Sequence, residues 1–298
     1  MIDAIELDLM ALADIGQPTK IAHEIHRQLR SQMGSVPTRA PLHAIAKAVG
    51  IVGIADVDAD SFEGTLVIQD GRGAIGLRRG LRSGRRNFTL GHEIGHFMIP
   101  THRFQKSSFQ CSAKDMALPS GTTGATPLEK IEFEASEFSA VLLVPEIEWT
   151  IARRKCGHGC DLNHIQQLAE SFDVSQEMMA KIYVRNADEN IAVLITQHGR
   201  VYRIIPGVSF PYMGLRKNMQ LPTSAEASRL SELGGKGTVT DLRETDASDW
   251  VARADKTNAI YEQTLVQEDG WAMTLLVAEL PSADEEDDRS WNRRSSRR

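Results

Sequence analysis

Apolar residues recur at helical spacing in the first 50 residues of the chain. Ile21, Ile25 and Leu29 lie one turn apart within residues 18–33, and a shorter pattern over residues 43–49 runs into a glycine. Apolar side chains three or four positions apart share one face of a helix, and glycine often follows a helix end. The pattern therefore predicts two amphipathic helices.

The spacing changes between residues 51 and 78, where short β-prone runs replace the helical pattern. Residues 64–69 and 74–77 form such runs, and Asp70-Gly71 lies between them. An Asp-Gly pair in this position is typical of a tight hairpin turn. We expect a small sheet in this part of the chain.

A long stretch without period precedes a well-marked helix. Residues 101–125 mix Ser, Thr, Gly and Gln, which predicts a surface loop that can act as a flap. Thr126, Pro127 and Glu129 then combine an N-cap, a proline in the first turn and a capping-box glutamate, and Pro145 ends the pattern. The sequence predicts a helix between these two prolines.

The second half of the chain changes from helices to strands. Helical patterns over residues 162–171 and 176–185 have helix-turn-helix spacing, and later hairpins are predicted across His198-Gly199 and Asp269-Gly270. The expected fold class is α+β. The expected parts are a first domain over 1–150, a helix-turn-helix-like module over 151–186, a β-rich domain over 187–280 and a disordered tail over 281–298.

The charge balance restricts the possible partners. The 298 residues carry 34 Lys and Arg against 40 Asp and Glu, a formal net charge of -6, so charge alone does not draw the chain to nucleic acid. No stretch approaches the roughly 18 apolar residues of a membrane span, and no signal-peptide pattern opens the chain. Three cysteines, an odd number, suit a reducing compartment. We therefore expect a cytoplasmic protein.

Two of these cysteines lie in the run Cys156-Gly-His158-Gly-Cys160. Thiolates and imidazoles bind zinc, but a structural zinc usually takes four ligands, and only His164 follows as a fourth. A second metal site and a plain loop between helices both stay open, and the loop is preferred.

The main chemical signal is His92-Glu93-Ile94-Gly95-His96. Its histidines are four residues apart, about 40° around a helix, so both imidazoles project from one face and can share a metal. Glu93 lies beside them. Its carboxylate can accept a proton from a water that zinc activates and pass it to the leaving amine.

A catalytic zinc of this kind needs a third protein ligand and one position open to water. On the capped helix, apolar residues centred on Ile131 form a buried arc. Among the glutamates of that helix only Glu134 falls inside the arc, at about 300° from Ile131, whereas Glu132 is expected to point away. His92, His96 and Glu134 are the predicted ligands of one zinc ion, with Glu93 as the catalytic base.

Residues 86–96 and 134–145 together resemble the ImmA/IrrE family of metallopeptidases. The first stretch contains the His-Glu-Ile-Gly-His run, and the second has Glu134-Ala-Ser136 where members typically show Glu-Ala-Asn. The resemblance covers roughly residues 40–186. It implies a gluzincin-like zinc endopeptidase with a zincin-like core of helices and a small sheet, with the same ligands and base.

The resemblance also implies a substrate and a role. In that family the substrates are repressors of the helix-turn-helix type, cut once to release stress-response or mobile-element genes. Some relatives carry a sensor-like C-terminal domain, and residues 187–280 are then its counterpart.

Substrate contacts are less sharply predicted. Gly73 to Leu77 is the expected strand for pairing with a substrate backbone. Five arginines lie between residues 78 and 86. One interpretation is that they hold an acidic substrate segment or an oxyanion. The other is that they form a solvated loop with an ion pair.

Two rival functions stay open. One is a DNA-binding or protein-binding transcriptional regulator with a zinc site that uses residues 162–185. Its would-be recognition helix over 176–185 has one Lys and one Arg, a poor match to phosphate, so direct nucleic-acid binding is not expected. The other is a scaffold without zinc chemistry, against which the intact Glu93 argues.

Overall fold

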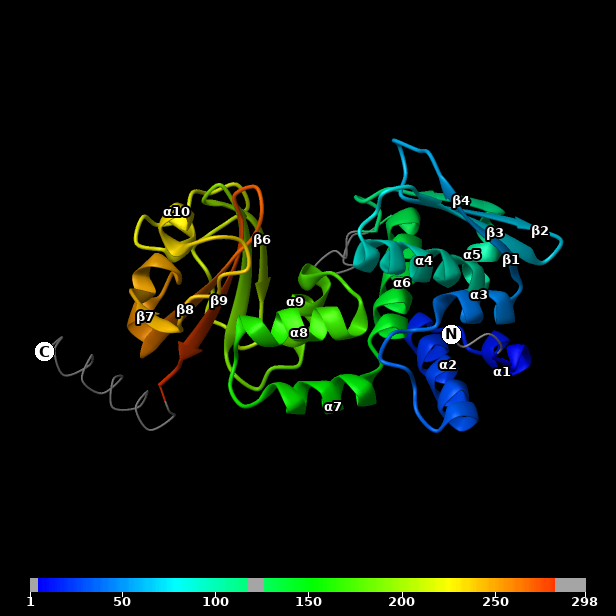
Figure 1. Cartoon of the computed structure of the whole chain (residues 1–298), viewed down its shortest axis with the longest axis horizontal. Helices are drawn as coiled ribbons and strands as arrows, with labels where there is room; N and C mark the ends of the chain where they lie inside the picture. Colours follow the sequence, from blue (N-terminus) through cyan, green and yellow to red (C-terminus); the bar gives the residue numbers. More distant parts are fainter. Residues whose placement is uncertain (1–4, 117–125, 282–298) are drawn as a thin grey trace, which may run out of the picture. The chain divides into compact units, whose positions relative to one another are not determined.

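The computed structural model describes residues 5–116 and 126–281 (Figure 1). The chain is α+β, as predicted, with a helix-rich first part and a β-rich second part. Contacts divide it into two compact units, and the helices predicted over 151–186 are shared between them. The first unit is Met1–Cys156 with Leu168–Ser175, and the second is Gly157–Gln167 with Gln176–Arg298.

The first unit combines packed helices with a small sheet. Its helices are α1 (Leu9–Ala13), α2 (Pro18–Met33), α3 (Leu42–Val49), α4 (Ser83–Met98), α5 (Pro100–Gln105), α6 (Pro127–Leu143) and α7 (Glu146–Cys156), and α8 (Leu162–Phe172) contributes to both units. Its strands are β1 (Ile51–Val57), β2 (Gly64–Gln69), β3 (Arg72–Arg78) and β4 (Ser108–Cys111).

The sheet of the first unit has the order β1-β3-β2-β4. The predicted hairpin is confirmed: Asp70 and Gly71 connect β2 to β3 with positive φ angles of 50° and 75°, as a tight turn of this type requires. The predicted substrate strand is wrong, because Gly73 to Leu77 belongs to β3, which is already paired on both sides. An edge strand is needed for pairing with another chain, and within the described residues β4 is an edge strand next to β2.

The stretch over 101–125 is more ordered than its composition indicates. Its first part forms α5 and β4, and β4 pairs with β2 through residues 108–111. The prediction of a loop is therefore wrong for this part, because tertiary pairing with β2 stabilises a strand too short to show a period. Residues 117–125 lie outside the described part of the chain.

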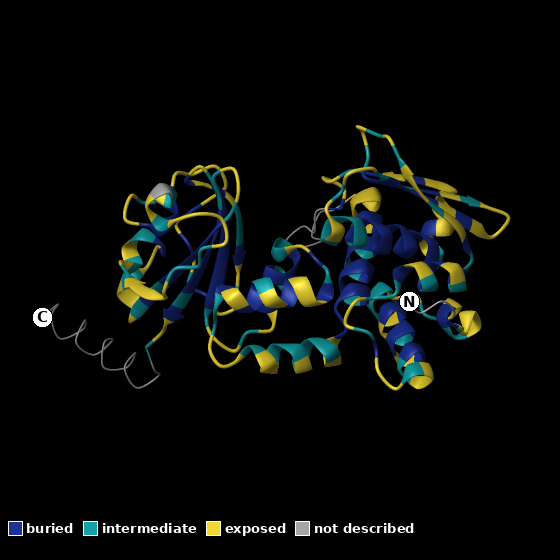
Figure 2. Cartoon of the chain, viewed as in Figure 1, coloured by how far each residue is buried: buried dark blue, intermediate teal, exposed yellow. Residues whose placement is uncertain are grey.

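Helices α4 and α6 form the centre of the first unit, and the faces on which they meet are buried (Figure 2). The capping box predicted at Thr126 and Glu129 is present at the start of α6. Glycines on α4 allow the two helices to approach closely. A Cβ atom at Gly95 would lie 2.9 Å from the ring of Phe138, and one at Gly91 would lie 2.5 Å from Ser139 Oγ. Any larger residue at either position would force the two helices apart.

The second unit is built around one antiparallel sheet. Its elements are α9 (Gln176–Arg185), β5 (Ile191–Gln197), β6 (Arg200–Pro206), η1 (Glu226–Ser228), α10 (Leu230–Leu233), β7 (Arg243–Thr245), η2 (Ala247–Asp249), η3 (Ala254–Lys256), β8 (Ala259–Val266) and β9 (Trp271–Glu279).

The strand order of this sheet is β6-β5-β9-β8-β7. Both predicted hairpins are confirmed, with positive φ at His198-Gly199 and at Asp269-Gly270. Trp250 and Leu276 belong to the apolar core that covers the sheet. In the part of the chain that is described, no helix has the length and apolar character required to cross a bilayer.

Candidate metal centre

Helix α4 carries the His-Glu-Ile-Gly-His run into the interior of the first unit. Every residue from Phe88 to Met98 is buried, and His92, Glu93 and His96 have no exposed surface. Burying polar side chains costs free energy unless they find partners. Three polar residues on the buried part of one helix therefore indicate a site rather than a packing face.

Four side chains from three elements meet at one point beside α4. The ligand atoms of His92, His96, Cys111 and Glu132 all lie within 4.8 Å of one another, and all four residues are buried. His92 Nε2 lies 3.0 Å from His96 Nε2, and Glu132 Oε2 lies 3.1 Å and 3.4 Å from these two nitrogens. This group can hold a metal ion.

The carboxylate that reaches the histidine pair belongs to Glu132 and not to Glu134. Glu134 Oε2 lies 3.1 Å from His102 Nε2 on α5, and Glu134 is not part of the group that meets at His92 and His96. The expectation that Glu132 points away is wrong, since its side chain is buried against both histidines.

The helical-wheel argument failed because α6 is buried on more than one side. It packs against α2 as well as α4, so a single apolar arc does not define its interior face. A second stripe of Glu132, Ser136 and Ser139 faces α4. Ser136 Oγ lies 3.2 Å from His92 Nδ1, and Ser139 Oγ donates a hydrogen bond of 2.8 Å to the carbonyl of Phe88. The spacing of four and three residues between these polar positions was the signal in the sequence.

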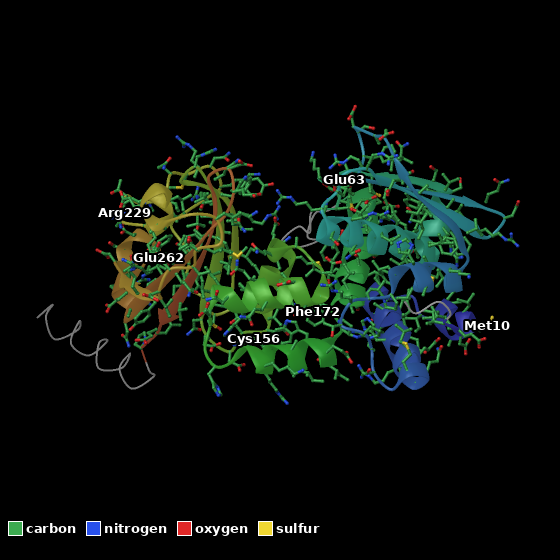
Figure 3. The ribbon with its side chains drawn as sticks, in the orientation of Figure 1. Met10, Glu63, Cys156, Phe172, Arg229 and Glu262 are labelled. Atoms are coloured by element: carbon green, nitrogen blue, oxygen red, sulfur yellow. The ribbon has the colours of Figure 1, made fainter. Side chains whose placement is uncertain are left out.

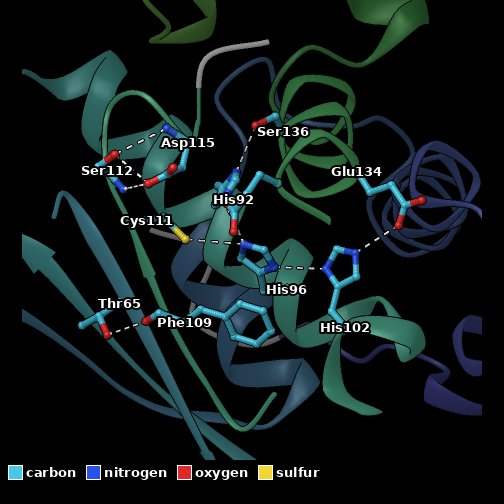
Figure 4. Close-up of polar contacts among 11 residues, drawn as sticks. Thr65, His92, His96, His102, Phe109, Cys111, Ser112, Asp115, Glu134 and Ser136 are labelled. Atoms are coloured by element: carbon cyan, nitrogen blue, oxygen red, sulfur yellow. Dashed lines mark hydrogen bonds and ion pairs between the residues drawn. The ribbon is translucent and has the colours of Figure 1, made fainter. Parts of the chain in front are cut away.

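Outer partners fix which nitrogens of the two histidines carry protons (Figure 4). The carboxylate of Glu134 only accepts hydrogen bonds, so His102 Nε2 donates to it. In a neutral His102 the other nitrogen, Nδ1, is then an acceptor, and His96 Nδ1 donates to it over 3.0 Å. His96 Nε2 is left as a bare lone pair.

Ser136 can do the same for the other histidine. When its hydroxyl oxygen accepts a hydrogen bond from His92 Nδ1, both Nε2 atoms face Glu132 Oε2 without a proton. Three electron-rich atoms 3.0–3.4 Å apart repel one another unless a cation lies between them. Outer hydrogen bonds of this kind are typical of metal-ligating histidines.

The separations fit the dimensions of a tetrahedral zinc site. Nitrogen and oxygen ligands about 2.0 Å from zinc lie about 3.3 Å apart, and a thiolate about 2.3 Å from zinc lies about 3.6 Å from a nitrogen ligand. The corresponding distances here are 3.0–3.4 Å, and 3.5 Å from Cys111 Sγ to His96 Nε2.

Burial also sets the charge of the imidazoles. It lowers the pKa of His96 to about 4, and it lowers the pKa of His102 to about 4. Both rings are therefore neutral near pH 7, and neutral imidazole is the form that binds metal.

Glu93 lies against the sheet next to the metal-ligating group. Neither carboxylate oxygen forms a hydrogen bond of good geometry among the described residues. Burial raises the pKa of Glu93 to about 8, although the nearby thiol of Cys111 acts in the opposite direction. A Cβ atom at Gly64 would collide with Glu93 Oε1, and Gly64 is paired with Cys111 between β2 and β4. The carboxylate therefore occupies space that only a glycine at position 64 leaves free.

The arginines between residues 78 and 86, before and in the first turn of α4, are largely engaged in ion pairs. Arg78 and Arg85 both contact Glu63, a buried residue labelled in Figure 3. Arg79 pairs with Asp58, and Arg86 pairs with Asp56. The alternative of a solvated loop with structural ion pairs fits these contacts better than a surface that holds substrate.

The second cysteine run does not form a site in the described part of the chain. Cys156, His158 and Cys160 are not among the side chains there that can share a metal. His164 Nδ1 lies 3.0 Å from the hydroxyl of Tyr183. The interpretation as a loop is retained.

A helix with two buried histidines, a second helix whose carboxylate reaches them and a small sheet beside them are the features of a metallopeptidase-like domain. Residues 52–182 match the family model Peptidase_M78, the IrrE N-terminal-like domain. The resemblance to the ImmA/IrrE family is therefore confirmed over this segment, which runs from β1 to α9. The C-terminal sheet lies outside the match.

Comparisons with curated sequences and with solved structures do not extend the family assignment. No curated protein sequence matches the chain. Among solved structures, a Mycobacterium tuberculosis transcriptional regulator is similar with a TM-score of 0.47 and 11% sequence identity. That match covers 92% of this chain and 77% of the regulator.

Proposed function

We propose that the chain is a zinc-dependent endopeptidase in which His92, His96 and Glu132 hold one zinc ion and Glu93 is the catalytic base. Glu132 takes the place that the sequence had assigned to Glu134. The observation that carries the proposal is the meeting of three lone-pair-bearing atoms, with both imidazoles oriented by outer partners, beside a buried carboxylate that has no described partner.

A zinc ion at this point would polarise a peptide carbonyl and lower the pKa of a water molecule. The remaining steps belong to residues of the chain. Glu93 accepts the proton of the attacking water and passes it to the leaving amine. His102 and Glu134 hold His96 in the tautomer that leaves Nε2 free, and Ser136 orients His92.

The substrate is proposed to be a protein that binds in an extended conformation along β4. This strand carries Cys111 at the metal-ligating group, and on its other side it is paired with β2. Backbone pairing with an edge strand gives affinity without a fixed sequence. A repressor of the helix-turn-helix type is the substrate that the family resemblance supports.

The contacts of α9 argue against the alternative of a DNA-binding regulator. This helix packs against β5 and β6, and six of its residues are buried. Glu177 forms ion pairs with Lys181 and Arg203, so one of the two cations of the helix is already paired with a carboxylate. A recognition helix needs an open face for the major groove.

The test compares the wild-type chain with Glu93→Gln in living cells and in solution. New protein N-termini are labelled and identified by mass spectrometry after expression of each form. We expect at least one cleavage product that depends on Glu93, while both purified proteins bind one zinc ion per chain. Identical sets of N-termini would overturn the peptidase assignment, and absence of zinc from the wild type would overturn the metal site.

A further inference from the structure

The thiol of Cys111 lies beside the three side chains proposed to hold zinc. Cys111 is the last residue of β4, has no exposed surface and forms no disulfide. Its Sγ lies 3.5 Å from His96 Nε2 (Figure 4), close to the separation of about 3.6 Å expected for two ligands of one tetrahedral zinc. Sulfur is also a preferred zinc ligand.

The strand geometry holds this thiol in place. Residues of β4 alternate between exposed and buried, so Phe109 and Cys111 point to the same inner side. The Phe109 ring stacks on His96 with centroids 4.2 Å apart and planes 18° apart. Phe109 thus packs on the metal-ligating imidazole, and Cys111 lies two residues further on the same face.

A second observation points to the same place. Glu93 is fully buried, and neither carboxylate oxygen forms a hydrogen bond of good geometry among the described residues. It lies against Gly64, the residue paired with Cys111, and close enough to the Cys111 thiol to interact with it. A buried carboxylate without partners requires a ligand, a water molecule or a proton nearby. The carboxylate and the thiol therefore border the same small space.

We propose that Cys111 Sγ is the fourth ligand of the metal and closes the site in a resting state, an inference that rests on the proposed zinc peptidase function. Two histidines, one glutamate and one cysteinate complete a tetrahedral set, which is the arrangement of closed rather than catalytic zinc sites. Opening breaks the metal–sulfur bond, and the released thiolate takes up one proton from solvent. The vacated position is then accessible to water and to a substrate carbonyl.

The location on β4 connects opening to substrate binding. The strand that carries Cys111 is the described edge strand proposed to pair with substrate. A substrate that pairs with β4 and displaces its last residue removes the fourth ligand at the same time. Cleavage then begins only when a matching chain is bound.

The first test uses cobalt(II) in place of zinc, because cobalt bound to a thiolate has a charge-transfer band in the near ultraviolet. We expect this band in the wild-type chain and its loss in Cys111→Ala, with cobalt still bound. Cys156→Ala is the matched control, since that cysteine lies outside the site, and it should keep the band. A wild type that binds cobalt without the band overturns the role of Cys111 and leaves the peptidase proposal intact.

The second test needs no variant. The chain is alkylated with and without bound zinc, under mild denaturant that exposes the first unit, and each cysteine is quantified by mass spectrometry. Zinc should protect Cys111 at least tenfold, whereas the half-buried Cys156 and Cys160 react equally in both samples. Equal alkylation of Cys111 in zinc-loaded and zinc-free protein would contradict the proposal. Failure of the wild type to bind either metal would instead remove the proposed function.

Discussion

Both units bury glutamates, and the pair Glu226 and Glu262 of the second unit is stabilised differently from Glu93 and Glu132 of the first. In the second unit Glu262 Oε1 accepts the backbone N–H of Glu226 over 2.7 Å, and Glu226 is paired with Arg243 and with the hydroxyl of Thr240. Glu262, labelled in Figure 3, lies on β8. Glu226 Oε1 has no hydrogen-bond partner among the described residues, but its ion pair with Arg243 supplies a cation from the same unit.

In the first unit Glu93 and Glu132 lack such compensation. The described partners of Glu132 are two imidazoles whose own outer partners leave their lone pairs facing it, and Glu93 has no described hydrogen-bond partner. Burial of charged groups is tolerated when they are paired or when they bind a cation. The difference teaches that a buried carboxylate marks a candidate site when its own unit supplies no cation for it: Glu226 has Arg243, whereas no arginine or lysine is paired with Glu93 or Glu132 among the described residues.

The largest expected effect is the difference in zinc affinity between variants of Glu132 and Glu134, two of the glutamates of α6. Glu132→Ala removes a direct ligand and should lower zinc affinity at least 100-fold. Glu134→Ala removes only the partner of His102, and outer-sphere changes of this kind typically reduce affinity by about 10-fold. Competition with a chromophoric chelator measures both.

The reverse order of these two affinities would show that Glu134 is the ligand after all. Equal, small losses would show that neither carboxylate contributes. Glu137→Ala serves as the control on the same helix and should bind zinc like the wild type.

A smaller effect, on cleavage, is expected from the contact between Gly64 of β2 and Glu93, the proposed catalytic base. In Gly64→Ala the new methyl group collides with Glu93 Oε1 and Thr89 Cγ2. Cleavage should fall at least tenfold while zinc affinity changes less than twofold, because the metal-ligating side chains are not touched. Gly53→Ala on β1 is the control, since a Cβ there meets no atom within 4 Å. Equal cleavage by both variants would place Glu93 outside the reaction.

The smallest effect concerns the second unit, where we expect a change of stability and none of metal binding. Burial raises the pKa of Glu262 to about 7 from 4.5, so the folded state keeps a proton that the unfolded state loses between these values. The free energy of unfolding should therefore fall by about 3 kcal/mol as the pH rises from 4.5 to 7.

Glu262→Gln should remove this pH dependence, and Glu244→Gln on the exposed part of β7 should keep it. Amide hydrogen exchange in β8 and β9 measures the effect. A pH profile that is unchanged in Glu262→Gln would assign the dependence to another group.

Local signals in the sequence predicted those parts of the fold that depend on neighbouring residues. The capping box of α6 and the hairpins at Asp70, His198 and Asp269 were confirmed because each is set by backbone conformation over a few residues. The pairing of His92 with His96 follows from the helical repeat alone, and the structure places both at one point.

The remaining site residues depend on contacts between distant elements. Glu132 rather than Glu134 faces the histidines because α6 is packed on both α2 and α4, which a single helical wheel does not represent. His102 and Cys111 lie in a stretch without period, and only pairing of β4 with β2 brings Cys111 to the histidines. Such residues carry no short-range pattern from which their role can be predicted.

The central claim is that His92, His96 and Glu132 share one zinc ion. Anomalous diffraction at the zinc edge from crystals of the zinc-loaded chain tests it most directly. We predict one strong peak about 2.0 Å from His92 Nε2, His96 Nε2 and a Glu132 oxygen. A peak between His102 and Glu134, or no peak within reach of the two Nε2 atoms, would contradict the account.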